Sequence, residues 1–293
     1  MKSFVFLIIL GFAISFAPAA QSWGTGSGSQ SLGADVSGAF SQMENALAQR
    51  DEDISSQDAY FLGRAVAANI LSRYGLYTGK PALTQYLNQI CTAITINSPM
   101  PEIYGGYHVS ILDSPDLNAF ATTGGHIFMC RGLLEAVTTE DALAAVLAHE
   151  IAHIQLKHSD QIIKNMRLTQ ALTDVAQRAS DIAVREAGLS EREVLFTNYV
   201  REMVNTLVVN GYSRDTEFQA DSYALTLLAL AGYSPASLVE VLTLLQRTAG
   251  AGGYNGTHPS PAQRINNVRG ALPQYRVQDT SSSRSSRFAG SVR

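Results

Sequence analysis

Hydrophobic residues recur at helical spacing over most of the chain after residue 55. In the segment 55–74 they lie three or four positions apart, behind two serines that can cap a helix. The same pattern predicts further helices at residues 81–94, 139–158, 213–231, 235–249 and 262–270. Between residues 160 and 211 the pattern is helical but more polar, which indicates either a helical excursion packed beside the functional site or a lid.

Three short segments alternate between apolar and polar residues and predict strands. They cover residues 108–112, 118–122 and 126–129. The pair Gly124-Gly125 predicts a hairpin turn between the last two. Thr138 and Asp141 then match the capping box with which a helix begins. The pattern therefore predicts an α+β fold that is mostly helical and contains a small sheet.

Composition fits a globular protein and restricts the kind of partner. The 293 residues are 46% hydrophobic and 16% charged, and the net charge is -4. Without a basic run, this charge excludes a nucleic-acid binder. Residues 21–54 are rich in Gly, Ser and Gln and predict a flexible leader, whereas the Ser/Arg-rich residues 276–293 predict a disordered tail. A single domain over residues 55–275 remains.

The first twenty residues have the pattern of an export signal. Lys2 precedes an apolar stretch over residues 4–16, and small residues with an A-x-A pattern follow. This predicts a signal peptide at residues 1–20 and export to the bacterial periplasm. The alternative interpretation is an uncleaved membrane anchor.

Export bears on the two cysteines of the chain, Cys91 and Cys130. In an exported protein they can form a disulfide that joins a helix to the sheet. They can equally be two buried free thiols, and the sequence leaves both interpretations open.

The most informative segment is His149-Glu150-Ile151-Ala152-His153. Two histidines four residues apart lie on one face of a helix and can hold one metal ion together. The intervening Glu150 is placed to take a proton from a water molecule that the metal activates. The motif predicts one Zn²⁺ per chain and a zinc-dependent peptidase.

A catalytic zinc ion needs a third protein ligand. The motif in which a third histidine follows on the same segment is excluded, because its positions here hold Leu156 and Ser159. His158 lies half a turn around the helix from His149, so we assign it to the helix C-terminus instead.

Glu217 is the better candidate for the third ligand. Asp221 follows one helical turn later on the same face, where it can hydrogen-bond a ligand histidine and fix its tautomer. Other glutamates in a more polar region lack such a second acid: Glu186, Glu191, Glu193 and Glu202.

These residues belong to a wider set of motifs. The set comprises Asn118-Ala119-Phe120-Ala121, Gly125-His126-Ile127 before Gly132-Leu133-Leu134, H-E-x-x-H, Glu217-Phe218-Gln219-Ala220-Asp221, and His258-Pro259-Ser260-Pro261 with Arg264. Over residues 55–272 the chain resembles the M48 zinc metallopeptidases. That family includes periplasmic and mitochondrial Oma1-like quality-control proteases and the prenyl-protein endopeptidases.

The resemblance implies a zincin-like fold with an active-site H-E-x-x-H helix. It also implies that Asn118, Ala119, Phe120 and Ala121 lie on an edge strand that rims the cleft. A substrate peptide would bind there as an added strand. Cleavage would then follow access to extended chain, as in unfolded proteins, more than a fixed sequence.

His258 and Arg264 enter through the same resemblance. His258 has three open roles: a donor that stabilises the oxyanion of the transition state, a fourth zinc ligand that keeps the enzyme latent, or a residue that only fixes its loop. Arg264 is expected to pair with an acid near the site, Asp221.

The sequence thus predicts a zinc endopeptidase of the cell envelope that cleaves misfolded or unassembled proteins. The main alternative is a zinc-bound chaperone or assembly factor with latent proteolysis, and Glu150 favours the enzyme. A non-peptidase zinc hydrolase is a third hypothesis, which the edge strand does not suggest. Substrate identity, oligomeric state and peripheral association with a membrane stay open.

Overall fold

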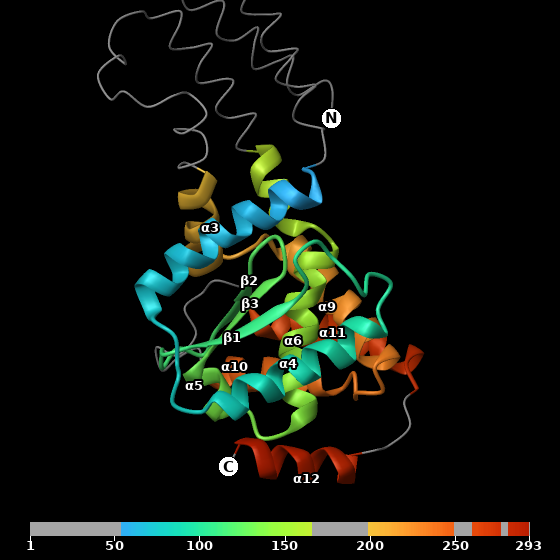
Figure 1. Ribbon diagram of the computed structural model, residues 1–293. Coiled ribbons are helices and arrows are strands. Elements are labelled where there is room, and N and C mark those ends of the chain that lie inside the picture. The colour runs from blue at the N-terminus through green and yellow to red at the C-terminus, as the bar shows by residue number, and fades with distance from the viewer. Residues whose placement is uncertain (1–53, 166–198, 249–259, 277–280, 293) are drawn as a thin grey trace, which may run out of the picture. The chain divides into compact units, whose positions relative to one another are not determined.

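The computed structural model describes residues 54–165, 199–248, 260–276 and 281–292 (Figure 1). The predicted signal peptide, the leader up to residue 53, the middle of the 160–211 region and His258 lie outside these residues. The strands are β1 His108–Leu112, β2 Ala119–Ala121 and β3 His126–Cys130. The helices are α3 Ser56–Tyr74, α4 Pro81–Ile96, α5 Arg131–Ala136, α6 Glu140–Gln155, α9 Arg214–Leu230, α10 Ser237–Thr248, α11 Pro261–Ala271 and α12 Ser281–Val292.

The three strands form one sheet in the order β1-β3-β2. β2 and β3 are the predicted antiparallel hairpin, and β1 lies parallel to β3. Their turn requires glycine, because Gly124 and Gly125 have φ values of 79° and 94°. β2 is therefore an edge strand of this sheet, as the resemblance implied.

Alternation along the strands builds two hydrophobic cores, one on each face of the sheet. Val109 and Ile127 belong to the cluster that α4 and α6 complete. Phe120 and Phe128 belong to the cluster that α3 completes. The mostly helical α+β prediction is confirmed, with helices covering both faces of a small sheet.

The two cysteines lie in different cores. Cys91 is buried in the cluster of α4 and α6, whereas Cys130 is buried in the cluster on the α3 face. Both thiols are free, so the disulfide interpretation is wrong and the interpretation with two buried thiols is confirmed. Burial raises the pKa of each thiol to about 12.

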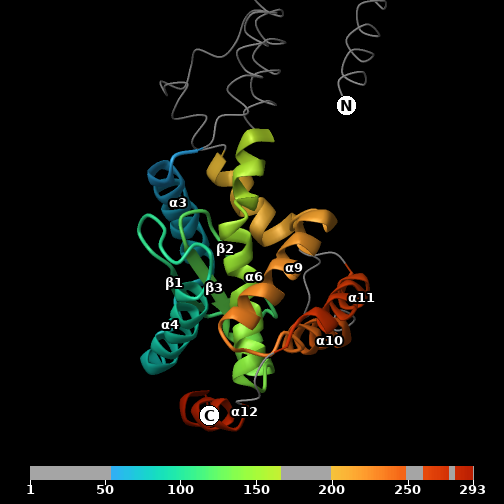
Figure 2. The ribbon, with the colours of Figure 1, turned by 90° about the vertical axis from the view of Figure 1, so that its right-hand side faces the viewer.

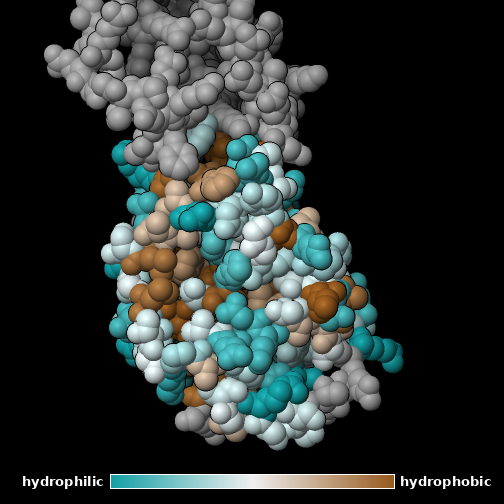
Figure 3. All heavy atoms as spheres, in the orientation of Figure 1, coloured by the Kyte–Doolittle hydropathy of each residue, from teal (hydrophilic) through white to brown (hydrophobic). Residues whose placement is uncertain are grey.

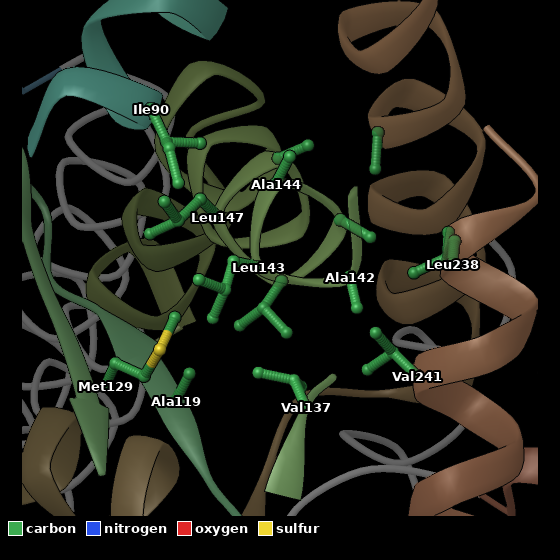
Figure 4. Packing of buried hydrophobic residues seen from close by; sticks show 14 of the residues in the cluster. Ile90, Ala119, Met129, Val137, Ala142, Leu143, Ala144, Leu147, Leu238 and Val241 are labelled. Carbon is green, nitrogen blue, oxygen red and sulfur yellow. The ribbon is translucent and has the colours of Figure 1, made fainter. Parts of the chain in front are cut away.

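Helix α6 is the central element of the domain. Figure 2 shows it running between the sheet and α4 on one side and α9, α10 and α11 on the other. In Figure 4, Ile90 and Met129 approach it from one side and Leu238 and Val241 from the other. The helix is buried along almost its whole length, which fits the segment Ala142–Ala148, where apolar residues occupy every position.

The start of α6 corrects the predicted capping box. The N-cap is Thr139, whose side chain accepts a hydrogen bond of 3.1 Å from the backbone N–H of Ala142. Asp141 instead accepts a hydrogen bond of 2.8 Å from the N–H of Ser234. The box at Thr138 and Asp141 is therefore wrong by one residue, because a tertiary contact uses the acid.

The C-terminal segment is also ordered differently from the prediction. Residues 281–292 form α12, and Arg284 and Phe288 are buried. Arg284 and Arg287 form ion pairs of 2.7 and 2.6 Å with Asp141 and Glu140. The predicted disordered tail is thus wrong for these residues. Composition alone could not show that their arginines pair with Asp141 and Glu140, which lie far away in the sequence.

The surface of the described residues is mixed. In Figure 3, hydrophobic side chains reach the surface at the end of α3, and polar residues cover much of the remaining coloured surface. None of the helices in the described ranges combines the length and the apolar character that crossing a membrane requires.

Candidate metal centre and active site

Two adjacent helices supply the predicted metal ligands. α6 carries His149 and His153, and α9 packs against it and carries Glu217. All three side chains are buried, Glu217 completely. α9 begins at the N-cap Ser213, so Glu217 lies in its first turn. The structure therefore places Glu217 beside His149 and His153. The sequence could propose Glu217 only from its residue type and its neighbour Asp221.

The separations of the ligand atoms fit a zinc ion. The Nε2 atoms of His149 and His153 are 3.2 Å apart. They lie 3.4 and 3.5 Å from the two carboxylate oxygens of Glu217. A tetrahedral Zn²⁺ with bonds of about 2.0–2.1 Å keeps its ligand atoms about 3.3 Å apart. Among the described residues, no second group of metal-ligating side chains converges in this way.

A charged residue pair supports two of the three ligands. The Nδ1 atom of His149 lies 3.1 Å from Asp221, which fits the predicted role of that acid. Arg264 of α11 donates two hydrogen bonds of 2.8 and 2.7 Å to Asp221, which confirms the predicted pairing. Arg264 also lies 2.9 Å from Glu217, a contact that the sequence did not predict.

Charges around the ligands favour a cation at their centre. Burial opposes ionisation of Asp221, yet Arg264 outweighs it and holds the pKa of that carboxyl below its usual range. Burial and Arg264 lower the pKa of His149, but hydrogen bonds to Asp221 and Glu217 outweigh them and raise it to about 9. Two carboxylates against one guanidinium therefore favour one further positive charge at the cluster, carried by protonated His149 or by a metal cation that displaces its proton.

Glu150 lies next to a small apolar cavity. It is buried, and with His149 it lines a cavity of about 40 Å³. Asn118 and Ala119, at the start of the edge strand, line the same cavity. The remaining lining is mainly aliphatic: Leu117, Leu133, Val146, Leu238, Val241, Leu242 and Leu245, with Arg264. The predicted base, one predicted metal ligand and the start of the edge strand therefore meet at one place.

Phe120 and Ala121 of the edge strand lie apart from this cavity. The Phe120 ring packs on the α3 face, with ring centroids 6.1 Å from those of Phe128 and Tyr74. Ala121 is buried in the opposite core. Any contact of these two residues with a substrate must therefore use their backbone, because their side chains face into the protein.

His158 is placed differently from its prediction. α6 ends at Gln155, and the chain turns through Lys157, which has a positive φ of 53°. This turn brings the Nδ1 atom of His158 to 3.0 Å from the Nδ1 atom of His153. The prediction failed because it assumed an uninterrupted helix as far as residue 158; the exposed turn at Leu156 and Lys157 is visible only in the structure.

Tyr212 is a further residue that sequence reasoning missed. Its ring stacks on His153, with centroids 4.3 Å apart and planes at 19°. Its hydroxyl lies 2.9 Å from the Ser159 hydroxyl, so the ring is held in place. A π-helical turn, Thr206–Asn210, precedes it, and no sequence pattern pointed to this contact.

Among the described residues, no other candidate from the sequence joins the cluster of His149, His153 and Glu217. Glu202 is described and lies outside the group of metal-ligating side chains. Glu186, Glu191 and Glu193 lie outside the described residues, as does His258, whose three roles stay predictions.

The site geometry agrees with a family comparison. The sequence profile described as Peptidase family M48 matches residues 81–272, which include every described residue of the metal cluster and the edge strand. The chain belongs to peptidase family M48. The resemblance inferred from the motifs is thereby confirmed, and so is the zincin-like α+β class of its fold.

Relatives of this M48 chain carry protease names. It is 28% identical over 232 residues to the mitochondrial metalloendopeptidase OMA1 of Schizosaccharomyces pombe, covering 76% of this chain and 61% of the relative. It is 24% identical over 213 residues to the beta-barrel assembly-enhancing protease of Escherichia coli K12, covering 69% and 42%. The protein of that name from Yersinia pestis is 25% identical over 219 residues, covering 71% and 43%. The chain thus spans roughly two fifths to three fifths of these relatives.

Proposed function

We propose that this M48 protein is a zinc-dependent endopeptidase. The observation that carries the proposal is the convergence of His149, His153 and Glu217 at the spacing of zinc ligands, directly beside Glu150. A zinc ion bound there would polarise a peptide carbonyl and acidify water. The names of the relatives support the same reaction class.

The residues of the chain would divide the remaining work. Glu150 takes the proton of the attacking water and passes it to the leaving amine. Asp221 holds His149 through its Nδ1 atom, and Arg264 neutralises part of the buried negative charge. The edge of β2 pairs with an extended substrate through backbone hydrogen bonds.

We propose unfolded or unassembled proteins of the cell envelope as substrates. Pairing along a strand edge selects extended chain over a particular sequence. The cavity beside Glu150 has room for about three water molecules, so it suits one small aliphatic side chain of the substrate. The export pattern of residues 1–20 supports a location outside the cytoplasm.

Replacing Glu150 tests the reaction. Glu150→Gln should retain zinc and lose about 10²- to 10⁴-fold in the rate of casein cleavage, because general-base catalysis is removed while the metal ligands stay. Glu102→Gln is the matched control, since Glu102 is exposed and away from the cavity. Equal cleavage by the wild type and Glu150→Gln would refute the proposed mechanism. The same inactive variant can be used in pull-downs to trap native substrates.

The alternative is a zinc-bound assembly factor with latent proteolysis. The deep burial of Glu150 and both histidines favours it, because the described site must open before a peptide reaches all three. Glu150→Gln separates the two functions. An assembly factor would keep its cellular function in this variant, whereas an enzyme would lose it.

A further inference from the structure

The two histidines of the proposed zinc site have different partners at their second ring nitrogens. Both Nε2 atoms face Glu217, so a neutral ring that binds metal through Nε2 must carry its hydrogen on Nδ1. On His149, that Nδ1 faces the Asp221 carboxylate at 3.1 Å. On His153, it faces the Nδ1 of His158 at 3.0 Å, so His153 donates and His158 accepts.

We propose that His158 is a positioning residue for the zinc ligand His153, whose tautomer and ring orientation it fixes through the hydrogen bond between their Nδ1 atoms. The inference rests on the proposed function, because it assumes that zinc binds at the cluster. The proposal gives a role to His158, which helical spacing alone would place on the side of the helix away from the site.

The local backbone is arranged to make this contact. Lys157 is the one residue other than glycine with positive φ in the described ranges, a conformation that non-glycine residues adopt at a cost. The turn at Lys157 stops α6 and returns the chain toward the His153 ring. His158 itself is buried at 8% exposure, so water does not compete freely for its Nδ1.

The residue after His158 also helps to fix the face of the His153 ring, through Tyr212. Ser159, next to His158, lies 2.9 Å from the hydroxyl of Tyr212, and the Tyr212 ring stacks on His153 at 4.3 Å. His153 is thus fixed at its edge by a hydrogen bond and on its face by an aromatic ring. Such double support is expected where ring orientation matters, because metal bonds tolerate little displacement of a ligand.

The experiment measures zinc affinity in the Glu150→Gln background, so that the result does not depend on peptidase activity. His158→Phe keeps an aromatic ring at this position and removes the acceptor. We expect a loss of zinc affinity of about 10- to 100-fold, measured by competition with a chelator. Thermal unfolding of the metal-free variant checks that the fold is intact.

His158→Asn and His158→Gln provide the matched pair. The Asn side-chain oxygen lies as many bonds from Cβ as the histidine Nδ1 does, so it should restore the zinc affinity to within a few fold. The Gln oxygen lies one bond further and should not. This comparison decides the point even if His158→Phe does not fold, because both amides are polar and of similar size.

The outcomes separate this inference from the proposed function. Unchanged zinc affinity in His158→Phe, or equal losses in His158→Asn and His158→Gln, would overturn the positioning role while leaving the zinc site in place. A Glu150→Gln parent that binds no zinc would overturn both. Absorption spectra of the Co²⁺-substituted variants provide a second readout, since a reoriented His153 changes the ligand geometry that these spectra report.

Discussion

At the scale of single residues, the site depends on buried charges that balance one another. Glu217 and Asp221 are fully buried, and Arg264, itself buried at 3% exposure, contacts both. A buried carboxylate is tolerated only when it is paired and hydrogen-bonded. Arg264 is therefore as necessary to the metal-free site as the two acids that it pairs with.

Removing Arg264 should destabilise the protein strongly. In the presence of a chelator, Arg264→Met should lower the free energy of unfolding by about 3–5 kcal/mol, because two buried carboxylates lose their cation. Urea denaturation measures this. Arg269→Met is the control on the same helix, since Arg269 is exposed and should change stability by less than about 0.5 kcal/mol. Similar losses in both variants would show that the ion pairs are not what stabilises the site.

At the scale of elements, α6 is fixed at both ends. At its start, Glu140 accepts hydrogen bonds from Tyr86 at 2.7 Å and from Tyr233 at 3.2 Å, and Arg287 of α12 pairs with it. At its end, the Gln155 amide donates to Tyr107, and Tyr223 donates to the Gln155 oxygen. The helix that carries three predicted site residues is therefore held by five other parts of the chain, and α12 is one of them.

The packing of α12 leads to a stability prediction. Phe288 is 5% exposed, so Phe288→Ala should lower the free energy of unfolding by about 3 kcal/mol through lost burial and a cavity. Ser286→Ala is the control, because Ser286 is exposed on the same helix. Chemical denaturation compares the two. A disordered tail would give no difference between them, and that result would contradict the docked helix.

At the scale of the whole molecule, zinc binding at the proposed site would be coupled to folding. The ligands come from α6 and α9, and Arg264 adds α11, so zinc would link helices that are distant in sequence. A ligand that binds only the folded state stabilises it by mass action. Zinc should therefore stabilise the entire domain and not only the site.

Zinc removal measures this coupling. With free zinc about 1,000-fold above its Kd, the folded state should gain about 4 kcal/mol over the chelated protein, seen as a higher midpoint of thermal unfolding. Glu217→Gln should lose most of this gain, because it weakens the third ligand. Equal midpoints with and without zinc would indicate that no ion binds the folded protein tightly.

The sequence by itself determined most of the elements, though not α5, α12 or the end of α6, and it predicted most of the site. Apolar periodicity gave the helices and the hairpin, because a helix or strand places side chains at fixed intervals. The spacing of His149, Glu150 and His153 predicted the ligand pair and the base, and the spacing of Glu217 and Asp221 predicted two carboxylates on one helix face. All of these are local in sequence, so chain geometry alone relates them.

Only the tertiary structure decided which distant residues meet. It separated Cys91 from Cys130 by the thickness of the sheet, docked α12 on the acids at the start of α6, and joined Arg264 to both Glu217 and Asp221. It also ended α6 before His158 and returned that residue to His153. The physical reason is that packing and charge pairing act between segments far apart in the chain, whereas periodicity describes one segment at a time.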